Sequence, residues 1–349
     1  MKKLFATLAF TLSAASLCAE TPLWLRDVKI SPDGSQIAFT YRGDIYKVPA
    51  TGGTAVRLTT QPSYEAEPVW SPDGSTIAFS SDRNGSMDIY VMSADGGVAT
   101  RLTSRSGNEV PESFTPDGKY VMFSAAIQDP VNSAMFPSGR LTELYKVPVS
   151  GGRIEQLLGT PAQMVSPAKD GSFFLYQDQK GMENEWRKHH TSSVTRDIWR
   201  YDAATGKHTN LTDHAGEDRN PVLSADGESF MFLSERNGGS MNVYQLPIAG
   251  GAAPKALTSF KEHPVRFLSQ AKNGLTALTW DGEIYTMTPG KKPQKVKIDI
   301  VRDDYDPIEY RMVSSGASGA IPSPDGKQVA FTHRGEVFVT SVDYRTTKQ

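Results

Sequence analysis

The sequence has only one cysteine, Cys18, in 349 residues, and its formal net charge is only −2. A mature chain cut after about Ala19 would therefore have neither a disulfide nor a thiol nucleophile. The low net charge gives no reason to expect nucleic acid or an acidic membrane surface as a partner. Gly-x-Ser-x-Gly and His-Glu-x-x-His motifs are also missing, so neither a self-contained hydrolase nor a zinc peptidase is expected.

Long apolar runs are missing as well, apart from Leu4–Leu17. Lys2 and Lys3 precede this run and small residues follow it, which is the pattern of a secretory leader. The run is too short for a membrane anchor, and the bulky Leu17 before Cys18 disfavours lipid attachment. We predict a leader over residues 1–19, an exported (periplasmic or secreted) protein, and no membrane insertion after the leader is removed.

Turns are what the sequence has in abundance, with 30 glycines and 22 prolines. Ser-Pro-Asp-Gly occurs at Ser31–Gly34 and returns six times, intact or altered. The final glycines are residues 34, 74, 118, 171, 227, 274 and 326. Pro presets the backbone of such a turn, Asp bonds back to it, and Gly takes a positive φ. The intervals of 40 to 56 residues are typical of propeller blades.

The second copy shows the repeating unit most clearly. Its four short β-runs are Ala66–Trp70, Thr76–Ser80, Asp88–Met92 and Ala99–Thr103. They alternate with period two and are separated by turn residues, the pattern of one four-stranded antiparallel blade. Aromatic residues recur at one place in the third run, which indicates blade packing rather than a ligand pocket. We predict an all-β fold, a six-bladed β-propeller followed by an incomplete seventh repeat.

Six complete copies occupy residues 22–298, residues 299–313 form a charged linker, and a seventh copy occupies 314–349 without an evident closing run. Two arrangements are open: six blades close one ring and the seventh begins a second propeller, or all seven share one ring. The charged break and the missing run favour the first. Because copy one starts with its first run and copy six ends with its fourth, closure is expected to rest on packing of blade six against blade one.

At this point the residues resemble a known family. The string from Pro68 to Thr103, with SPDG, IAF, IYVM and RLT in order, is similar to the propeller repeats of TolB and of tricorn-like proteases. Three features favour the tricorn-like peptidases: the position of the first blade directly after the leader, the insertion Gly181–Asp197, and the segment Gly316–Thr340. The last segment is similar to the opening of their second propeller.

The resemblance implies the N-terminal, non-catalytic part of a secreted serine peptidase, a scaffold and gating propeller involved in peptide degradation. No catalytic position of that family has a counterpart here, so this chain alone is expected to be inactive. The implied partners are peptides and the other domains of the peptidase, and a homo-oligomer stays open. The alternative is a free-standing periplasmic interaction module of the TolB type.

The candidate site residues lie in loops. The insertion Gly181–Asp197 and a second one, Ile127–Leu141, each follow the second run of their repeat, so both should project from the face that carries the connections between blades. We assign that face to docking or peptide contact. The candidates are Trp186, Arg187, His189, His190, Arg196, Glu65, Glu67, Glu109, Glu217 and Asp218.

Other chemistry has weaker support. His189 and His190 are adjacent, so in an extended segment they point to opposite sides and do not grip one metal ion. Asp82–Gly85 and Glu235–Gly238 lack the alternating ligands of a calcium loop and fit solvated turns. Trp186 fits a covering for a blade edge as well as an interface. We therefore expect no metal site and no cofactor.

Overall fold

The computed structural model describes residues 22–127, 141–188, 190–236, 240–301, 315–344 and 347–348. The expected leader, most of the insertion Ile127–Leu141 and most of the expected linker lie outside these residues. The described chain forms β-strands, and no helix within it is long and apolar enough to span a bilayer. Seven four-stranded antiparallel sheets follow one another in sequence.

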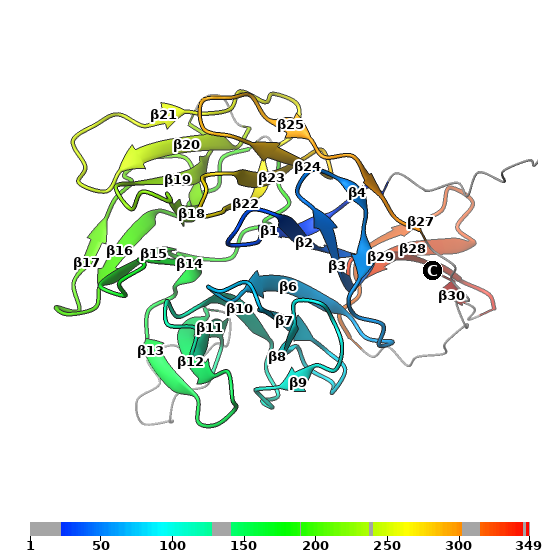
Figure 1. Ribbon diagram of the computed structural model, residues 1–349. Helices are drawn as coiled ribbons and strands as arrows, with labels where there is room; N and C mark the ends of the chain where they lie inside the picture. Colours follow the sequence, from blue (N-terminus) through cyan, green and yellow to red (C-terminus); the bar gives the residue numbers. More distant parts are fainter. Residues whose placement is uncertain are drawn as a thin grey trace, which may run out of the picture.

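Six sheets form the ring in Figure 1. Blade 1 contains β1 (Arg26–Ile30), β2 (Gln36–Tyr41), β3 (Asp44–Pro49) and β5 (Val56–Arg57). Blade 2 contains β6 (Glu65–Trp70), β7 (Thr76–Ser81), β8 (Asp88–Ser93) and β9 (Thr100–Arg101). Blade 3 contains β10 (Glu109–Phe114), β11 (Tyr120–Ala125), β12 (Glu143–Pro148) and β13 (Glu155–Leu158).

Blade 4 contains β14 (Gln163–Pro167), β15 (Phe173–Gln177), β16 (Ile198–Asp202) and β17 (His208–Asn210). Blade 5 contains β18 (Asp218–Leu223), β19 (Ser229–Ser234), β20 (Asn242–Pro247) and β21 (Lys255–Ala256). Blade 6 contains β22 (Arg266–Gln270), β23 (Thr276–Trp280), β24 (Glu283–Met287) and β25 (Gln294–Lys295). The first strand of each blade is innermost, and contacts between these strands run around the ring from β1 to β22 and back to β1. The predicted six-bladed fold is confirmed.

The repeated turn folds as its residues dictate. In the first copy, Ser31 Oγ donates to Asp33 Oδ1 (2.6 Å) and accepts the backbone N–H of Gln36 (2.9 Å). Gly34 has a φ of +80°, which a glycine adopts without strain. Hydrogen bonds from Ser31 and Ser35 lower the pKa of Asp33 to about 2. The turn thus fixes the pairing of the first two strands of a blade.

A Leu-Thr pair closes blades 1, 2, 4 and 5 and bonds the fourth run to the third strand. Leu58 N–H donates to the carbonyl of Ile45 (2.8 Å), and Thr59 Oγ1 accepts the N–H of the same residue (2.9 Å). The equivalent threonine bonds recur in three further blades, at Thr103, Thr212 and Thr258. A threonine hydroxyl therefore satisfies a backbone donor that the short outer strand cannot reach.

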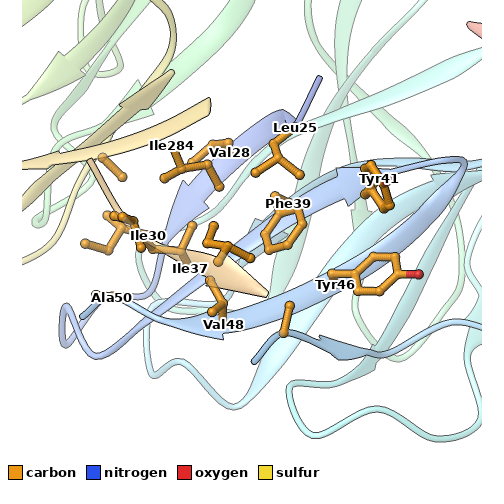
Figure 2. Packing of buried hydrophobic residues seen from close by; sticks show 14 of the residues in the cluster. Leu25, Val28, Ile30, Ile37, Phe39, Tyr41, Tyr46, Val48, Ala50 and Ile284 are labelled. Atoms are coloured by element: carbon orange, nitrogen blue, oxygen red, sulfur yellow. The ribbon is translucent and has the colours of Figure 1, made fainter. Parts of the chain in front are cut away.

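The core consists of apolar clusters between neighbouring blades. In β2, Ile37 and Phe39 pack toward blade 6, and Ala38 between them packs toward blade 2. Figure 2 shows the first of these clusters, in which Ile284 of blade 6 lies against Val28 of blade 1. The expected packing of blade 6 on blade 1 is thus present. The recurring aromatic residues also pack within blades, for example Tyr46 on Phe39.

Ring closure also uses a strand pair that the sequence did not indicate. β26 (Ile298–Asp299) pairs in parallel with β4 (Gly53–Thr54) of blade 1. Gly53 N–H donates to the carbonyl of Lys297, and Ala55 N–H to that of Asp299, both at 2.9 Å. The chain after blade 6 is therefore hydrogen-bonded to blade 1, and the start of the expected linker belongs to this pair.

The seventh repeat corrects one expectation. It has a closing strand, because β30 (Thr347–Lys348) pairs with β29 (Glu336–Ser341) and completes a sheet with β27 (Ser318–Pro322) and β28 (Gln328–His333). Two residues suffice for this strand, too few to recognise as a run. Figure 1 shows the sheet beside blade 1, outside the ring. Its hairpin contacts blade 2 through Arg334, which pairs with Asp82 at 2.5 Å.

The parallel pair gives a test of closure at Gly52. A Cβ atom on Gly52 would lie 2.5 Å from the carbonyl oxygen of Lys297, whereas one on Gly151, the equivalent glycine of blade 3, would meet no atom within 4 Å. Both glycines have positive φ, so alanine brings similar backbone strain at both positions. We expect Gly52→Ala to lower the free energy of unfolding by about 1–3 kcal/mol more than Gly151→Ala, because of the clash. Equal losses in urea denaturation would show that the pair does not hold the ring closed.

Candidate functional site: the mouth of the channel

The blades of a propeller surround a central channel, and the innermost strands beside it share an irregularity. Each carries a β-bulge, and the bulged residue has a positive φ in five of the six blades: Asp27, Glu67, Met164, Asn220 and Phe267. A bulge releases a backbone N–H from its own sheet, and a buried N–H requires an acceptor. Side chains of the preceding blade supply acceptors: Glu112 to Met164 N at 2.6 Å and Gln177 to Asn220 N at 2.9 Å.

Three carboxyl groups of blades 1 to 3 collect along these strands. Burial raises the pKa of Asp27 and, together with the negative charge of Asp27, raises that of Glu67 well above its ordinary value. Burial also raises the pKa of Glu112 to about 7, although Ser124 and Met164 donate hydrogen bonds to it. Among the described residues, the carboxylate of Glu67 has no hydrogen-bonding or ion-pairing partner. This side of the channel therefore carries three carboxyl groups whose burial favours the protonated form.

The insertion Gly181–Asp197, here called the strap, lies on the face expected for it. Loops between second and third strands meet the connections between blades there; for example, Glu65 N–H donates to the carbonyl of Gly43 (2.7 Å), and Asp218 N–H to that of Arg196 (3.0 Å). The strap begins in blade 4, but it contacts residues of blades 5, 6 and 1. In a ring of six blades, blade 1 lies opposite blade 4. The strap thus crosses the mouth of the channel.

Arg187 is the main anchor of the strap. Only 2% of its side chain is exposed. Its guanidinium group pairs with Glu217 and, at 2.7 Å, with Glu235, and it donates to the carbonyl of His190. Burial alone would raise the pKa of Glu217, yet the guanidinium groups of Arg219 and Arg196 hold it below its ordinary value. Both carboxylates of blade 5 are thus neutralised by residues of the strap and its surroundings.

Contacts with blades 6 and 1 hold other parts of the strap over the mouth. Arg266 donates to the carbonyls of Glu185 and, at 3.1 Å, Arg187. The ring of Trp186 lies edge-on to Phe267, with centroids 6.0 Å apart. The guanidinium carbons of Arg26 and Arg266 each lie 4.9 Å from the Trp186 ring centroid, a cation–π distance. Trp186 nevertheless keeps 48% of its surface exposed.

The structure brings four of the predicted site residues together: Trp186, Arg187, Arg196 and Glu217 meet in the strap and its anchor. Arg196 contributes by pairing with Glu217 at 2.5 Å and with Glu185 at 3.1 Å. His190 is exposed, 3.9 Å from the carboxylate of Glu183, and His189 lies outside the described residues. No group of metal-ligating side chains occurs among the residues that the structure describes.

Other predicted residues stay apart from this cluster. Glu65 pairs with Arg83 (3.1 Å) and Asp218 with Arg236 (2.5 Å), each within its own blade and fully buried. Glu109 is buried and accepts a hydrogen bond from Thr103; burial raises its pKa to about 7. Contact of these three residues with a partner stays a prediction, and it would require the internal bonds to open. Of the acidic candidates, Glu67 alone has no hydrogen-bonding or ion-pairing partner for its side chain among the described residues.

Several residues of the site were not anticipated from the sequence. Glu235 was assigned to a solvated turn; instead it is buried and binds Arg187, because the strap supplies a cation that sequence spacing does not reveal. Arg219, Arg266, Asp27 and Glu112 were not singled out. Aligning the first runs of the repeats would have shown that Asp27 and Glu112 fall near the same position, but only the bulge places them along the channel.

The raised pKa of Glu112 predicts a pH-dependent stability. The folded state binds a proton up to about pH 7, while the ordinary value is 4.5. Stability from this group is therefore full below pH 4.5 and lost as pH rises through 7. Between pH 5 and pH 8 the wild type should lose about 2 kcal/mol more unfolding free energy than Glu112→Gln. The exposed Glu228→Gln is the matched control; a slope in Glu112→Gln equal to that of wild type would contradict the assignment.

The comparisons with known proteins agree with this architecture. The family model described as the tricorn protease N-terminal beta propeller domain matches residues 22–293. The crystal structure of the tricorn protease superposes with a TM-score of 0.66 at 23% identity, covering 94% of this chain and 31% of that one. The chain thus spans about a third of that protease.

TolB structures show a similar fold at lower scores. A TolB-type protein from Agrobacterium tumefaciens gives a TM-score of 0.54 at 19% identity, covering 68% of this chain and 82% of that one. TolB from Acinetobacter baumannii gives 0.51 at 21% identity, covering 77% and 64%. These similarities concern the fold alone. With the family model matching most of its length, the chain belongs to the family of tricorn protease N-terminal β-propeller domains.

Proposed function

We propose that this chain is the non-catalytic scaffold and gating propeller of a tricorn-like serine peptidase, and that peptide hydrolysis takes place in domains outside it. Membership in the family supports the association with a protease. The observation that carries the gating role is the strap, which crosses one mouth of the channel and is anchored there by the ion pairs of two buried arginines, Arg187 and Arg196. A cover anchored by a few ion pairs is suited to opening.

The charged groups of the channel support peptides as the molecules that bind in it or pass through it. Carboxyl groups of Asp27, Glu67 and Glu112 line one side, and the guanidinium groups of Arg219 and Arg266 lie at the mouth. A peptide carries a cationic amine, which would favour ionisation of these carboxyl groups, and carboxylates, which the guanidinium groups can bind. We further propose that residues 1–19 are an export leader and that the seventh sheet, whose Ile321 and Val337 are exposed, begins a second propeller after the linker.

The gating role predicts that the strap controls access to the channel. In a Cys18→Ser background, Glu67→Cys places the chain's one thiol at the bulge of β6. We expect Arg187→Ala to speed the reaction of this thiol with a maleimide at least about fivefold. If the strap stayed docked, Glu235 would lose its arginine partner, whereas Glu217 would keep Arg196. The buried carboxylate of Glu235 would then cost about 3–5 kcal/mol, which favours release of the strap. Lys188→Ala, which removes an exposed side chain of the strap, is the control; equal rates in all three proteins would refute gating.

Two further observations separate the alternatives. The purified chain should not hydrolyse peptides, and hydrolysis blocked by a serine-directed reagent would contradict the non-catalytic role. Stable capture of a protein from an envelope extract by the isolated chain would instead favour an interaction module of the TolB type.

A further inference from the structure

Cations outnumber their anionic partners under the strap. Four guanidinium groups, those of Arg187, Arg196, Arg219 and Arg266, lie near the three carboxylates of Glu185, Glu217 and Glu235, and the first three of them form ion pairs with these carboxylates. Arg187 and Arg196 take most of this negative charge, since they hold Glu217 and Glu235 at hydrogen-bonding distance. The charge of Arg219 acts on Glu217, but among the described residues no carboxylate lies within hydrogen-bonding distance of Arg219 or Arg266.

Arg219 is the more unusual of the two. Only 6% of its surface is exposed, and its buried Nε and Nη1 atoms have no hydrogen-bond acceptor among the described residues. The nearest carboxylate oxygen, Oε2 of Glu185, is 3.8 Å from Nη2, which is beyond hydrogen-bonding distance. Buried donors are almost always satisfied in folded proteins. The Nε and Nη1 donors of Arg219 are therefore available to an acceptor from a ligand.

Arg266 adds a second donor fork that lacks a charge partner. Among the described residues, its hydrogen bonds go to two neutral carbonyls, those of Glu185 and Arg187. Burial, followed by the positive charge of Arg219, lowers its pKa to about 10. The two positively charged guanidinium groups therefore repel each other, and an anion bound to both would offset this repulsion. Planar guanidinium forks match a carboxylate in geometry and bind it with two parallel hydrogen bonds.

We propose that Arg219 and Arg266 form a carboxylate-binding site at the mouth of the channel, and that Glu185 of the strap occupies it loosely until a peptide carboxylate replaces it. The side chain of Glu185 is 45% exposed and reaches Arg219 only at 3.8 Å, so an incoming carboxylate can bind more closely. This inference deepens the proposed function, on which the choice of a peptide as carrier rests.

The surroundings select a singly charged group on a peptide over a phosphate or a polyanion. Asp27, Glu67 and Glu112 line the same channel, and the charge of Glu185 is close enough to raise the pKa values of Glu67 and Glu112. These carboxyl groups are neutral when protonated and negative when ionised, so they offer a polyanion no attraction. A peptide amine would favour their ionised form, so a peptide can be held at both ends. The carboxylate belongs either to the C-terminus of the peptide or to an acidic side chain.

Calorimetric titration of the full chain with three synthetic tripeptides tests the site. The first, Ala-Ala-Ala, has a free C-terminus; the second is its C-terminal amide; the third is the amide of Ala-Glu-Ala. We expect the first or the third to bind at least about tenfold more tightly than the second, and the one that binds identifies the source of the carboxylate. Equal affinity of all three peptides, or no binding by any, would overturn the proposal.

Three variants assign the binding to the proposed residues. Arg219→Gln should weaken the carboxylate-bearing peptide at least about tenfold, while Arg153→Gln, at an exposed arginine of blade 3, should not change it. Glu185→Gln should tighten binding about threefold or more, because it removes the internal competitor; this gain does not depend on the folding of the Arg219 variant. Unchanged affinity in both Arg219→Gln and Glu185→Gln would refute the site. Calorimetry measures binding without hydrolysis. The test of the carboxylate site therefore does not depend on whether the chain belongs to an active peptidase.

Discussion

The burial of one guanidinium group governs the functional face of this propeller. The guanidinium group of Arg187 can be buried because Glu217 and Glu235 of blade 5 and the carbonyl of His190 bind it. A buried charge that loses its partners is strongly destabilising, so the position of Arg187 decides where the strap lies. With Arg187 in place, Trp186 reaches Phe267, Arg266 caps two strap carbonyls, and the mouth is crossed from blade 4 to blade 1.

The ring supplies the frame for this arrangement, and the frame could be predicted from the sequence. Ser-Pro-Asp-Gly turns fix where the strands of a blade reverse, and period-two alternation assigns Ile37 and Phe39 to one blade interface and Ala38 to the next. These are local signals, because each residue's role depends on its near neighbours in the chain. The strap's location on the face of the connections between blades followed from the same topology.

What could not be predicted depends on contacts between distant residues. Arg187 meets Glu235 across 48 positions, and nothing in the spacing of a repeat links them. The bulges at Asp27 and Glu67 appear only in the pairing of neighbouring strands, which no single run reveals. The parallel pair of β26 with β4 and the two-residue β30 are too short to carry a pattern. Sequence reasoning thus found the blades and the strap, but not the charges that hold the strap.

The central claim is that the ion pairs of Arg187 hold the strap over the mouth. A double-mutant cycle on Arg187 and Glu235, with Arg187→Met, Glu235→Gln and the double variant compared in urea denaturation, measures it most directly. The account predicts a coupling free energy of about 2 kcal/mol or more, because the two side chains are buried and 2.7 Å apart. Additive effects of the two substitutions, within about 0.5 kcal/mol, would contradict it.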